Sequence, residues 1–273
     1  MKFVYIFIWL GMMASTLCAQ SYTEVVEQAM ECTQKDSLRQ AEALFRKALK
    51  MDPKNPRNAL LFSNLGTVQK RMGKTDEAIE SYSMALNITP YATAILLNRA
   101  ALYMEQGLLD KAYLDYCNVI DLIPEEQEAR LFRAYIYMQR RQYAEARIDY
   151  NVILNKDLKN KPARLGLVLL DEKESRVTRA LDALNLLISD YPQDASLLKM
   201  RANMEVDQQQ WELALLDVEA AIQLENRDTE SYLMKGNICL ELGKKAEART
   251  AFEQAIALGV PRTELQEKLK ACK

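Results

Sequence analysis

The chain repeats itself every 34 residues, and this period constrains its fold more than any other feature of the sequence. Six segments begin at this spacing with a small or aliphatic residue, at Gly66, Ala100, Ala134, Val168, Ala202 and Gly236. An alanine follows twelve residues later in every segment, at Ala78, Ala112, Ala146, Ala180, Ala214 and Ala248. A seventh copy with Ala29 and Ala41 lies upstream, offset by three extra residues between Pro53 and Asn58. Such a period predicts a stack of similar supersecondary units.

Each unit reads as two helices joined by a turn. A large residue stands four positions after each alanine and an apolar one three positions later, which places all three on one helical face. The large residues are Phe45, Tyr82, Tyr116, Tyr150, Leu184, Val218 and Phe252. Gly73, Gly107 and Gly243 interrupt three units midway. Prolines such as Pro53 and Pro90 end the second helix because they lack an amide hydrogen. Strong helix formers dominate, so the expected fold class is all-α.

This pattern resembles the tetratricopeptide repeat over residues 22–262. Asn64-Leu65-Gly66, followed by Ala78, Tyr82, Ala85 and Pro90, lies close to the ideal motif. The resemblance implies a right-handed superhelical solenoid of antiparallel helix hairpins. One solenoid is expected over 20–273, with repeats at about 22–55, 59–92, 93–126, 127–160, 161–194, 195–228 and 229–262 and a capping helix at 263–272.

Some features depart from the motif or complete it. The large aromatic residue near the start of each first helix appears only as Phe62 and Tyr232. Repeats five and six lack the mid-unit glycine, so a different turn is open to them. Ser21 with Glu24 predicts a capping box for the first helix, and Thr263 with Gln266 predicts one for the last.

Residues 1–19 have the organisation of a secretory signal peptide. Lys2 is the only charge, the stretch from Phe3 to Met13 is nearly all apolar, and small or neutral residues precede Ala19. We expect cleavage near Ala19 and an exported protein, periplasmic or associated with an outer membrane. An uncleaved membrane anchor is the alternative, although the apolar run is shorter than the roughly 20 residues of a spanning helix.

The composition argues against catalysis and against nucleic-acid binding. The chain has no histidine, which excludes histidine-based triads and histidine-liganded metals. It contains no phosphate-binding glycine loop and no paired-cysteine motif. The net charge is −2 and basic residues are spread along the chain, whereas a nucleic-acid binder needs a concentrated basic face. We therefore expect no enzyme, no cofactor, no metal and no nucleic-acid partner.

Arginine and aspartate occur together at two register positions sixteen residues apart. Only the third, fourth and sixth repeats carry this combination. A partly buried arginine is tolerated when a carboxylate meets its planar guanidinium. The expected structural ion pairs are Arg99–Asp115, Arg133–Asp149 and Arg201–Asp217. The alternative is a row of arginines offered to an acidic ligand.

The candidate binding site is the groove that first helices line in the family resembled. Its expected apolar residues follow i, i+4 and i+7 spacing and are Leu97, Met104, Leu131, Tyr135, Met138, Leu165 and Leu169, with Phe132 beside them. Lys199 and Asn203 are the polar candidates for the same groove. The competing interpretation is that neighbouring repeats bury them. Lys199 and Asn203 match half of the carboxylate clamp that some family members use, but Met234 stands where the second asparagine belongs, so we expect no clamp.

The resulting functional hypothesis is an exported scaffold or adaptor that binds protein or peptide segments in the groove. The alternative is a carrier or receptor for a small ligand such as a glycan, because sugar sites stack rings on aromatic residues and Trp211 and Tyr135 are available. A membrane contact is expected only through an uncleaved leader.

Overall fold

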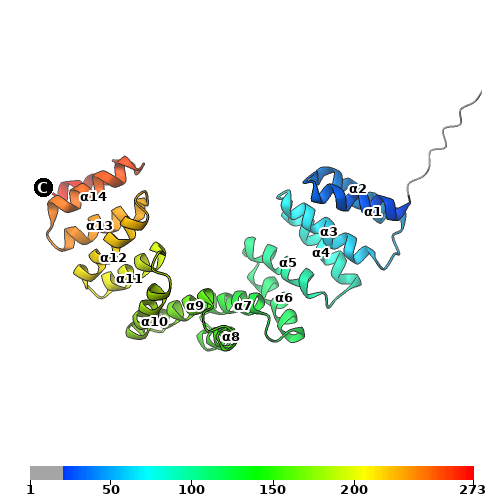
Figure 1. The fold of residues 1–273 in the computed structure, drawn as a ribbon, viewed down its shortest axis with the longest axis horizontal. Helices are drawn as coiled ribbons and strands as arrows, with labels where there is room; N and C mark the ends of the chain where they lie inside the picture. The colour runs from blue at the N-terminus through cyan, green and yellow to red at the C-terminus, as the bar shows by residue number, and fades with distance from the viewer. Residues whose placement is uncertain (1–20) are drawn as a thin grey trace, which may run out of the picture. The chain divides into compact units, whose positions relative to one another are not determined.

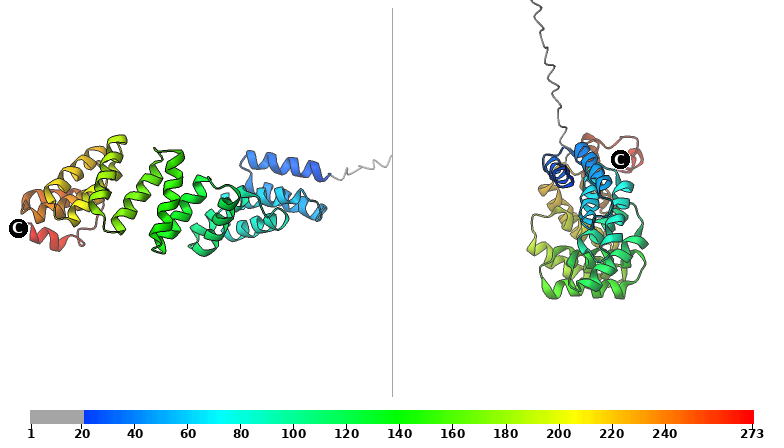
Figure 2. Two further views of the ribbon diagram at one scale, coloured as in Figure 1. Left: turned by 90° about the horizontal axis from the view of Figure 1, so that it is seen from below. Right: turned by 90° about the vertical axis from the view of Figure 1, so that its right-hand side faces the viewer.

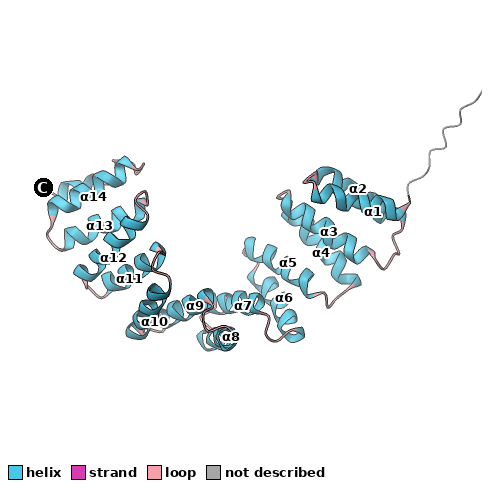
Figure 3. Ribbon diagram, viewed as in Figure 1, coloured by secondary structure: helices cyan, strands magenta, loops and turns pink. Residues whose placement is uncertain are grey.

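A computed structural model describes residues 21–273, so the leader predicted for residues 1–19 lies outside the described part of the chain. This part is entirely helical and contains no strand (Figure 3). None of its helices combines the length and apolar character that crossing a membrane requires. Contacts divide the chain into two compact units, one ending at Leu122 and one beginning at Ile123. We call them unit 1 and unit 2.

Unit 1 contains three consecutive helix hairpins (Figure 1). Within it α2 contacts α3 and α4 contacts α5, so each hairpin packs on the next. The helices are α1 (Tyr22–Gln34), α2 (Leu38–Met51), α3 (Asn58–Arg71), α4 (Thr75–Ile88), α5 (Thr93–Glu105) and α6 (Leu109–Leu122).

Unit 2 contains four hairpins and a short terminal helix, and Figure 2 shows both units from two further sides. Consecutive hairpins again contact one another through α8 and α9, α10 and α11, and α12 and α13. The helices are α7 (Gln127–Gln139), α8 (Tyr143–Lys156), α9 (Lys161–Lys173), α10 (Val177–Asp190), α11 (Ala195–Asp207), α12 (Trp211–Leu224), α13 (Thr229–Glu241), α14 (Lys245–Ala257) and α15 (Gln266–Ala271).

The residues that recur in the sequence form the core of each unit. All seven repeat alanines, from Ala41 to Ala248, are completely buried, and so are the large residues four positions later, apart from Tyr150 at 5% exposure. The alanine lets the two helices of a hairpin approach, and the large side chain fills the space beside it. Burying such a side chain stabilises the fold by about 1.5–3 kcal/mol, which explains how a short hairpin persists within a stack.

All seven turns between paired helices share one backbone conformation. The turn residues Asp36, Gly73, Gly107, Arg141, Ser175, Gln209 and Gly243 have φ between 59° and 73°. The following amide bonds to a carbonyl five residues earlier, as in Leu108 N to Tyr103 O and Gln210 N to Glu205 O, both 2.8 Å. This is the Schellman arrangement that ends a helix. The turns of repeats five and six therefore do not differ from the others, because the backbone bonds hold a non-glycine residue in the left-handed region.

The two ends of the described chain differ in how well the sequence predicted them. The capping box of Ser21 and Glu24 is confirmed, since the Glu24 amide donates to Ser21 Oγ at 3.2 Å and the Ser21 amide to Glu24 Oε2 at 2.9 Å. The second predicted box is wrong. Turns run from residue 261 to 265, so α15 begins at Gln266 behind Leu265, and no side chain caps it. Leu265 is buried and Leu269 packs beside it, so α15 covers the last hairpin.

Candidate binding surfaces

The first helices of unit 2 expose one side chain per repeat at a single register position. These residues are Tyr135 on α7, Leu169 on α9, Asn203 on α11 and Asn237 on α13. We call them the first-helix column. Tyr135 is 47% exposed and Leu169 is 36% exposed, and α7 and α9 are in contact. The upper half of the column, Tyr135 and Leu169, is therefore apolar and accessible. Its lower half, Asn203 and Asn237, carries amides.

The other groove candidates of unit 2 are only partly accessible. Leu131 and Met138 pack against the core cluster that contains Ala134 and Tyr150, and Phe132 is half-buried. Leu165 packs against the next cluster, which contains Val168 and Leu184. These side chains are thus partly buried and partly exposed. Each of them meets both the groove interpretation and the interpretation that neighbouring repeats bury it only in part.

Leu97 and Met104 belong to unit 1. Both lie on α5 and are half-buried. The most accessible apolar side chain among the first helices of this unit is Leu60 on α3, at 62% exposure.

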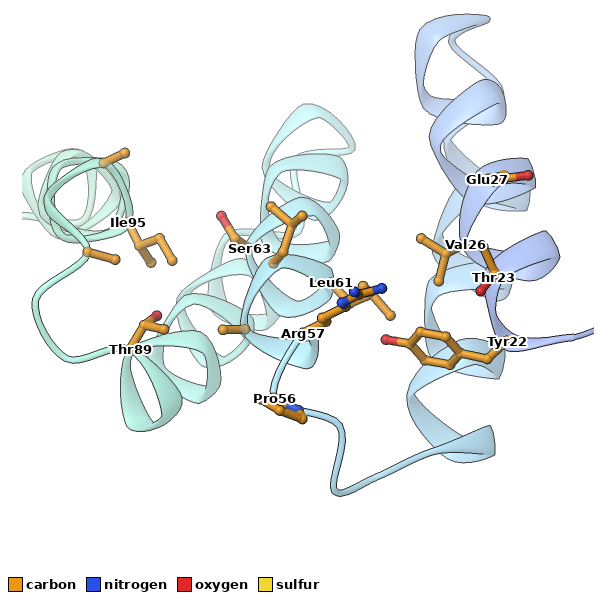
Figure 4. Close-up of a pocket in the computed structure, with 14 residues that line it drawn as sticks. Tyr22, Thr23, Val26, Glu27, Pro56, Arg57, Leu61, Ser63, Thr89 and Ile95 are labelled. Carbon is orange, nitrogen blue, oxygen red and sulfur yellow. The ribbon is translucent and has the colours of Figure 1, made fainter.

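A pocket of about 650 Å³ lies in unit 1 at the start of α1, α3 and α5. Tyr22, Val26, Leu61 and Ile95 are among its apolar lining residues (Figure 4). Leu60 also lines it. The Tyr22 hydroxyl donates to Asn58 Oδ1 at 3.0 Å, which fixes the ring at the rim. This pocket was not predicted from the sequence. Leu60 could have indicated it, because this residue is large and apolar where the later repeats carry small, polar or proline residues. Those residues are Ala94, Glu128, Pro162, Ser196 and Glu230.

A second pocket of about 380 Å³ lies in unit 2 beside the lower half of the first-helix column. Asn203 and Asn237 line it together with Trp211, Val206 and Met234. Asn237 Oδ1 already accepts a hydrogen bond of 2.7 Å from Lys268 Nζ. The pocket therefore combines apolar side chains with the amides of Asn203 and Asn237 and the carboxylates of Glu230 and Glu241.

Lys199 does not offer a free ammonium group to a ligand. Its Nζ lies 3.0 Å from Asp228 and 3.2 Å from Glu230, both at the start of α13, and its side chain is 18% exposed. Burial lowers the pKa of Lys199 and its bonds to the two carboxylates raise it, with a net increase. The lysine therefore ties α11 to α13, and the structure does not pair it with Asn203.

The three arginines predicted to form ion pairs each meet their aspartate through two hydrogen bonds. Nε and Nη2 of Arg99 lie 2.8 Å from the Asp115 carboxylate oxygens, and Arg133 meets Asp149 at the same distances. The Arg201–Asp217 distances are both 2.6 Å. The aspartates are between 0% and 6% exposed. These guanidinium groups are thus committed to internal carboxylates and do not form a row for an acidic ligand.

Two of these arginines also cross to the preceding repeat. Nη1 of Arg99 donates to Ser83 at 2.9 Å, and Nη1 of Arg201 donates to Asn185 at 2.7 Å. Each partner stands sixteen residues before its arginine, as each aspartate stands sixteen residues after it. One guanidinium therefore joins two hairpins, a contact that the sequence analysis did not anticipate.

Two further charged clusters join successive repeats, and the sequence analysis missed both. In unit 1, Glu42 of α2 bonds to Arg46 at 2.9 Å and to Lys74 at 2.8 Å. Burial raises the pKa of Glu42, but these bonds outweigh it and lower the pKa to about 2. In unit 2, the buried Asp171 of α9 meets Arg147 of α8 at 2.5 Å.

Glu42 and Arg147 occupy the same register position, since each directly follows a repeat alanine. We call this the junction position. Its residue faces the next repeat, where Glu42 meets a lysine and Arg147 meets carboxylates. Only a comparison of successive repeats could have shown that opposite charges occupy one position.

Among residues 21–273, no group of three or more acidic, cysteine or histidine side chains is arranged to hold a metal ion. The geometry is that of a helical repeat protein whose accessible features include the first-helix column, apolar at Tyr135 and Leu169, and pockets beside its first helices.

Comparison with known proteins agrees with this description. Tetratricopeptide repeat profiles match residues 34–93 and 229–258. A tetratricopeptide repeat protein from Parabacteroides merdae ATCC 43184 has 33% sequence identity and a TM-score of 0.72, covering 92% of this chain and 98% of its own. The chain belongs to the tetratricopeptide repeat family.

More distant structures share the fold. Pseudomonas aeruginosa pilF is 19% identical with a TM-score of 0.59, covering 79% of this chain and 97% of its own. YrrB, described as a TPR protein with an unusual peptide-binding site, is 16% identical with a TM-score of 0.50, covering 66% of this chain and 93% of its own. No curated protein matches the chain.

Proposed function

We propose that this protein is an exported interaction scaffold that binds segments of a protein partner on the first helices of unit 2. The observation that carries the proposal is the exposure of Tyr135 and Leu169 at one register position of consecutive repeats. Exposed apolar side chains in adjacent rows suit a partner that inserts apolar anchors. Proteins of this family are generally scaffolds rather than enzymes, and the fold is shared with YrrB, itself described as peptide-binding.

The neighbouring residues support an extended or helical peptide as the ligand. Phe132 and Met138 add half-buried apolar surface on α7, and methionine adapts to ligands of different shape. The amide of Asn203 lies further along the column, where it can bond to a peptide backbone. An apolar anchor site followed by an amide is the combination that holds a peptide segment in a fixed direction.

The test is capture of partners from the cell envelope by the protein and by two matched double variants. Tyr135→Ala with Leu169→Ala removes the apolar half of the column. Losing two side chains that the partner would bury is expected to weaken binding at least tenfold, because burial of each contributes about 1.5–3 kcal/mol. Ile148→Ala with Leu216→Ala is the control, since these side chains are 61% and 63% exposed on the second helices α8 and α12.

Capture that depends on Tyr135 and Leu169 but not on Ile148 and Leu216 supports the proposal. Equal capture by all three proteins contradicts it. A photo-crosslinking amino acid at position 135 then identifies the bound segment, and a crosslink to a glycan instead of a peptide would favour the small-ligand alternative.

The exported location is proposed from residues 1–19 and has its own test. The protein is produced with its natural N-terminus, the cell compartments are separated, and the mature N-terminus is sequenced. We expect a periplasmic or outer-membrane fraction in which the chain begins near Gln20. A full-length chain that stays in the cytoplasm would contradict export without affecting the proposed binding surface.

A further inference from the structure

Glu205 is a buried carboxyl group with one oxygen that no hydrogen bond satisfies. It lies on α11 and is 7% exposed. Its Oε1 is 4.0 Å from Nε of Arg201, but that guanidinium already gives two hydrogen bonds to Asp217 of α12. Its Oε2 is buried without a partner. Two carboxylates thus share one arginine, and the second of them is poorly compensated.

The register explains why Glu205 has no cation of its own and shares Arg201 with Asp217. The equivalent residue of repeat five is Asp171, which meets Arg147 at the junction position of the preceding repeat. For Glu205 the junction position holds Leu181 of α10, a half-buried apolar residue that packs against the core cluster containing Met204. The charged groups that face Glu205 are therefore Arg201 from α11 and Asp217 from α12, whereas α10 contributes an apolar side chain at this place.

The third and fourth repeats show the uncharged version of this site. There the equivalent residues are Tyr103 and Tyr137, whose rings lie under the guanidinium groups of Arg99 and Arg133 with 5.7 Å from Cζ to the ring centroid. A neutral ring can stack on an arginine that is already paired with an aspartate. A second carboxylate at that place instead repels the aspartate.

We propose that the α11–α12 hairpin is a proton-sensitive element of unit 2, in which Glu205 takes up a proton near neutral pH and so relieves its repulsion with Asp217. Burial is the largest cause that raises the pKa of Glu205, the Asp217 carboxylate adds to it, and Arg201 opposes both, which brings the pKa to about 7. An unfolded chain restores the ordinary value of 4.5. The folded hairpin then binds more protons than the unfolded one between these values, so its stability falls as the pH rises from about 5 to about 7.

The composition makes this response unusually easy to isolate. The chain has no histidine, which is the residue that ordinarily titrates in this range. Trp211 begins α12, and Trp9 is the only other tryptophan. In a chain carrying Trp9→Phe, tryptophan fluorescence therefore reports on this hairpin alone.

The test is urea unfolding followed by Trp211 fluorescence at pH values from 5 to 8. The unfolding equilibrium constant is expected to rise by up to about tenfold per pH unit from pH 5 to pH 7 and to level off above. Glu205→Gln keeps the shape and removes the charge, so the rise should disappear. Glu241→Gln, at an exposed position on α13, is the matched control and should keep it.

A Glu205→Gln variant that keeps the full pH dependence would overturn the proposal. If that variant does not fold, the pKa of Glu205 is measured directly by carbon NMR of its carboxyl group in the protein without this substitution. A titration midpoint above pH 6 supports the proposal, and a midpoint at or below pH 6 overturns it.

Discussion

Arg133 holds Asp149 with two hydrogen bonds of 2.8 Å, and this aspartate is completely buried. A second arginine, Arg130, donates to the same carboxylate. Asp149 therefore neutralises two guanidinium groups inside unit 2, and its loss would leave both without their buried partner.

Asp149→Ala is expected to destabilise unit 2 by about 3–5 kcal/mol, because removing one member of a buried ion pair leaves an uncompensated charge. Urea unfolding followed by circular dichroism measures the change. Asp190→Ala is the control, since Asp190 is 47% exposed in its pair with Arg164 and should cost less than about 1 kcal/mol. Equal effects of the two substitutions would show that Asp149 contributes no more than a surface charge.

Gly166→Ala is expected to destabilise unit 2 by about 1–3 kcal/mol, although alanine normally strengthens a helix. A Cβ atom at Gly166 would lie 2.3 Å from Cζ of Tyr150, so the ring must move. Differential scanning calorimetry measures the effect. Adding Tyr150→Leu should recover part of the loss, and a stabilising Gly166→Ala would mean that the ring relocates without cost.

Ser175→Gly is expected to stabilise its hairpin by about 0.5–1 kcal/mol, because Ser175 has a φ of 59° that glycine adopts without steric strain. Gly107→Ala should have the opposite effect, since Gly107 has a φ of 70°. Thermal unfolding of both variants gives the comparison. A destabilising Ser175→Gly would indicate that the flexibility glycine adds to the unfolded chain outweighs the relief of strain.

Acid is expected to weaken unit 1 through Glu42. Its pKa is lowered to about 2 in the folded chain from an ordinary 4.5, so its stabilisation is present above pH 4.5 and is lost as the pH falls toward 2. The loss is at most about 3 kcal/mol. Unfolding of the protein and of Glu42→Gln between pH 2 and pH 6 tests this. The variant should show a shallower decline, and parallel curves would exclude Glu42 as the cause.

The all-helical fold could be predicted because the 34-residue period continues without a break from the second repeat to the seventh, and the buried alanines with their large neighbours follow directly from it. Contacts of the Arg99–Asp115 type could also be predicted from the sequence, because the arginine and the aspartate occur together in the same repeats. The turns were harder to predict. Ser175 and Gln209 are not residue types that indicate a positive φ, and the backbone hydrogen bonds impose it.

The surface was the hardest part to predict. Helical spacing places Leu131 and Tyr135 on one face, but it cannot show that Leu131 packs into the core while Tyr135 remains 47% exposed. That difference depends on how closely the next hairpin approaches, which is a property of the whole stack. The unit 1 pocket depends in the same way on three helices that are distant in sequence.

The opposite charges at the junction position imply that the repeats of this protein cannot be freely reordered. Repeat one presents Glu42 to a follower that carries Lys74, whereas repeat four presents Arg147 to a follower that carries Asp171. A shuffled chain in which repeat two followed repeat four would place Gln69 and Met72 where Arg147 now meets Asp171 and Glu174, so the arginine would lose both carboxylates. Although the helices are alike in length, the charge at the junction position of the first and fourth repeats thus matches each of these hairpins to the one that follows it.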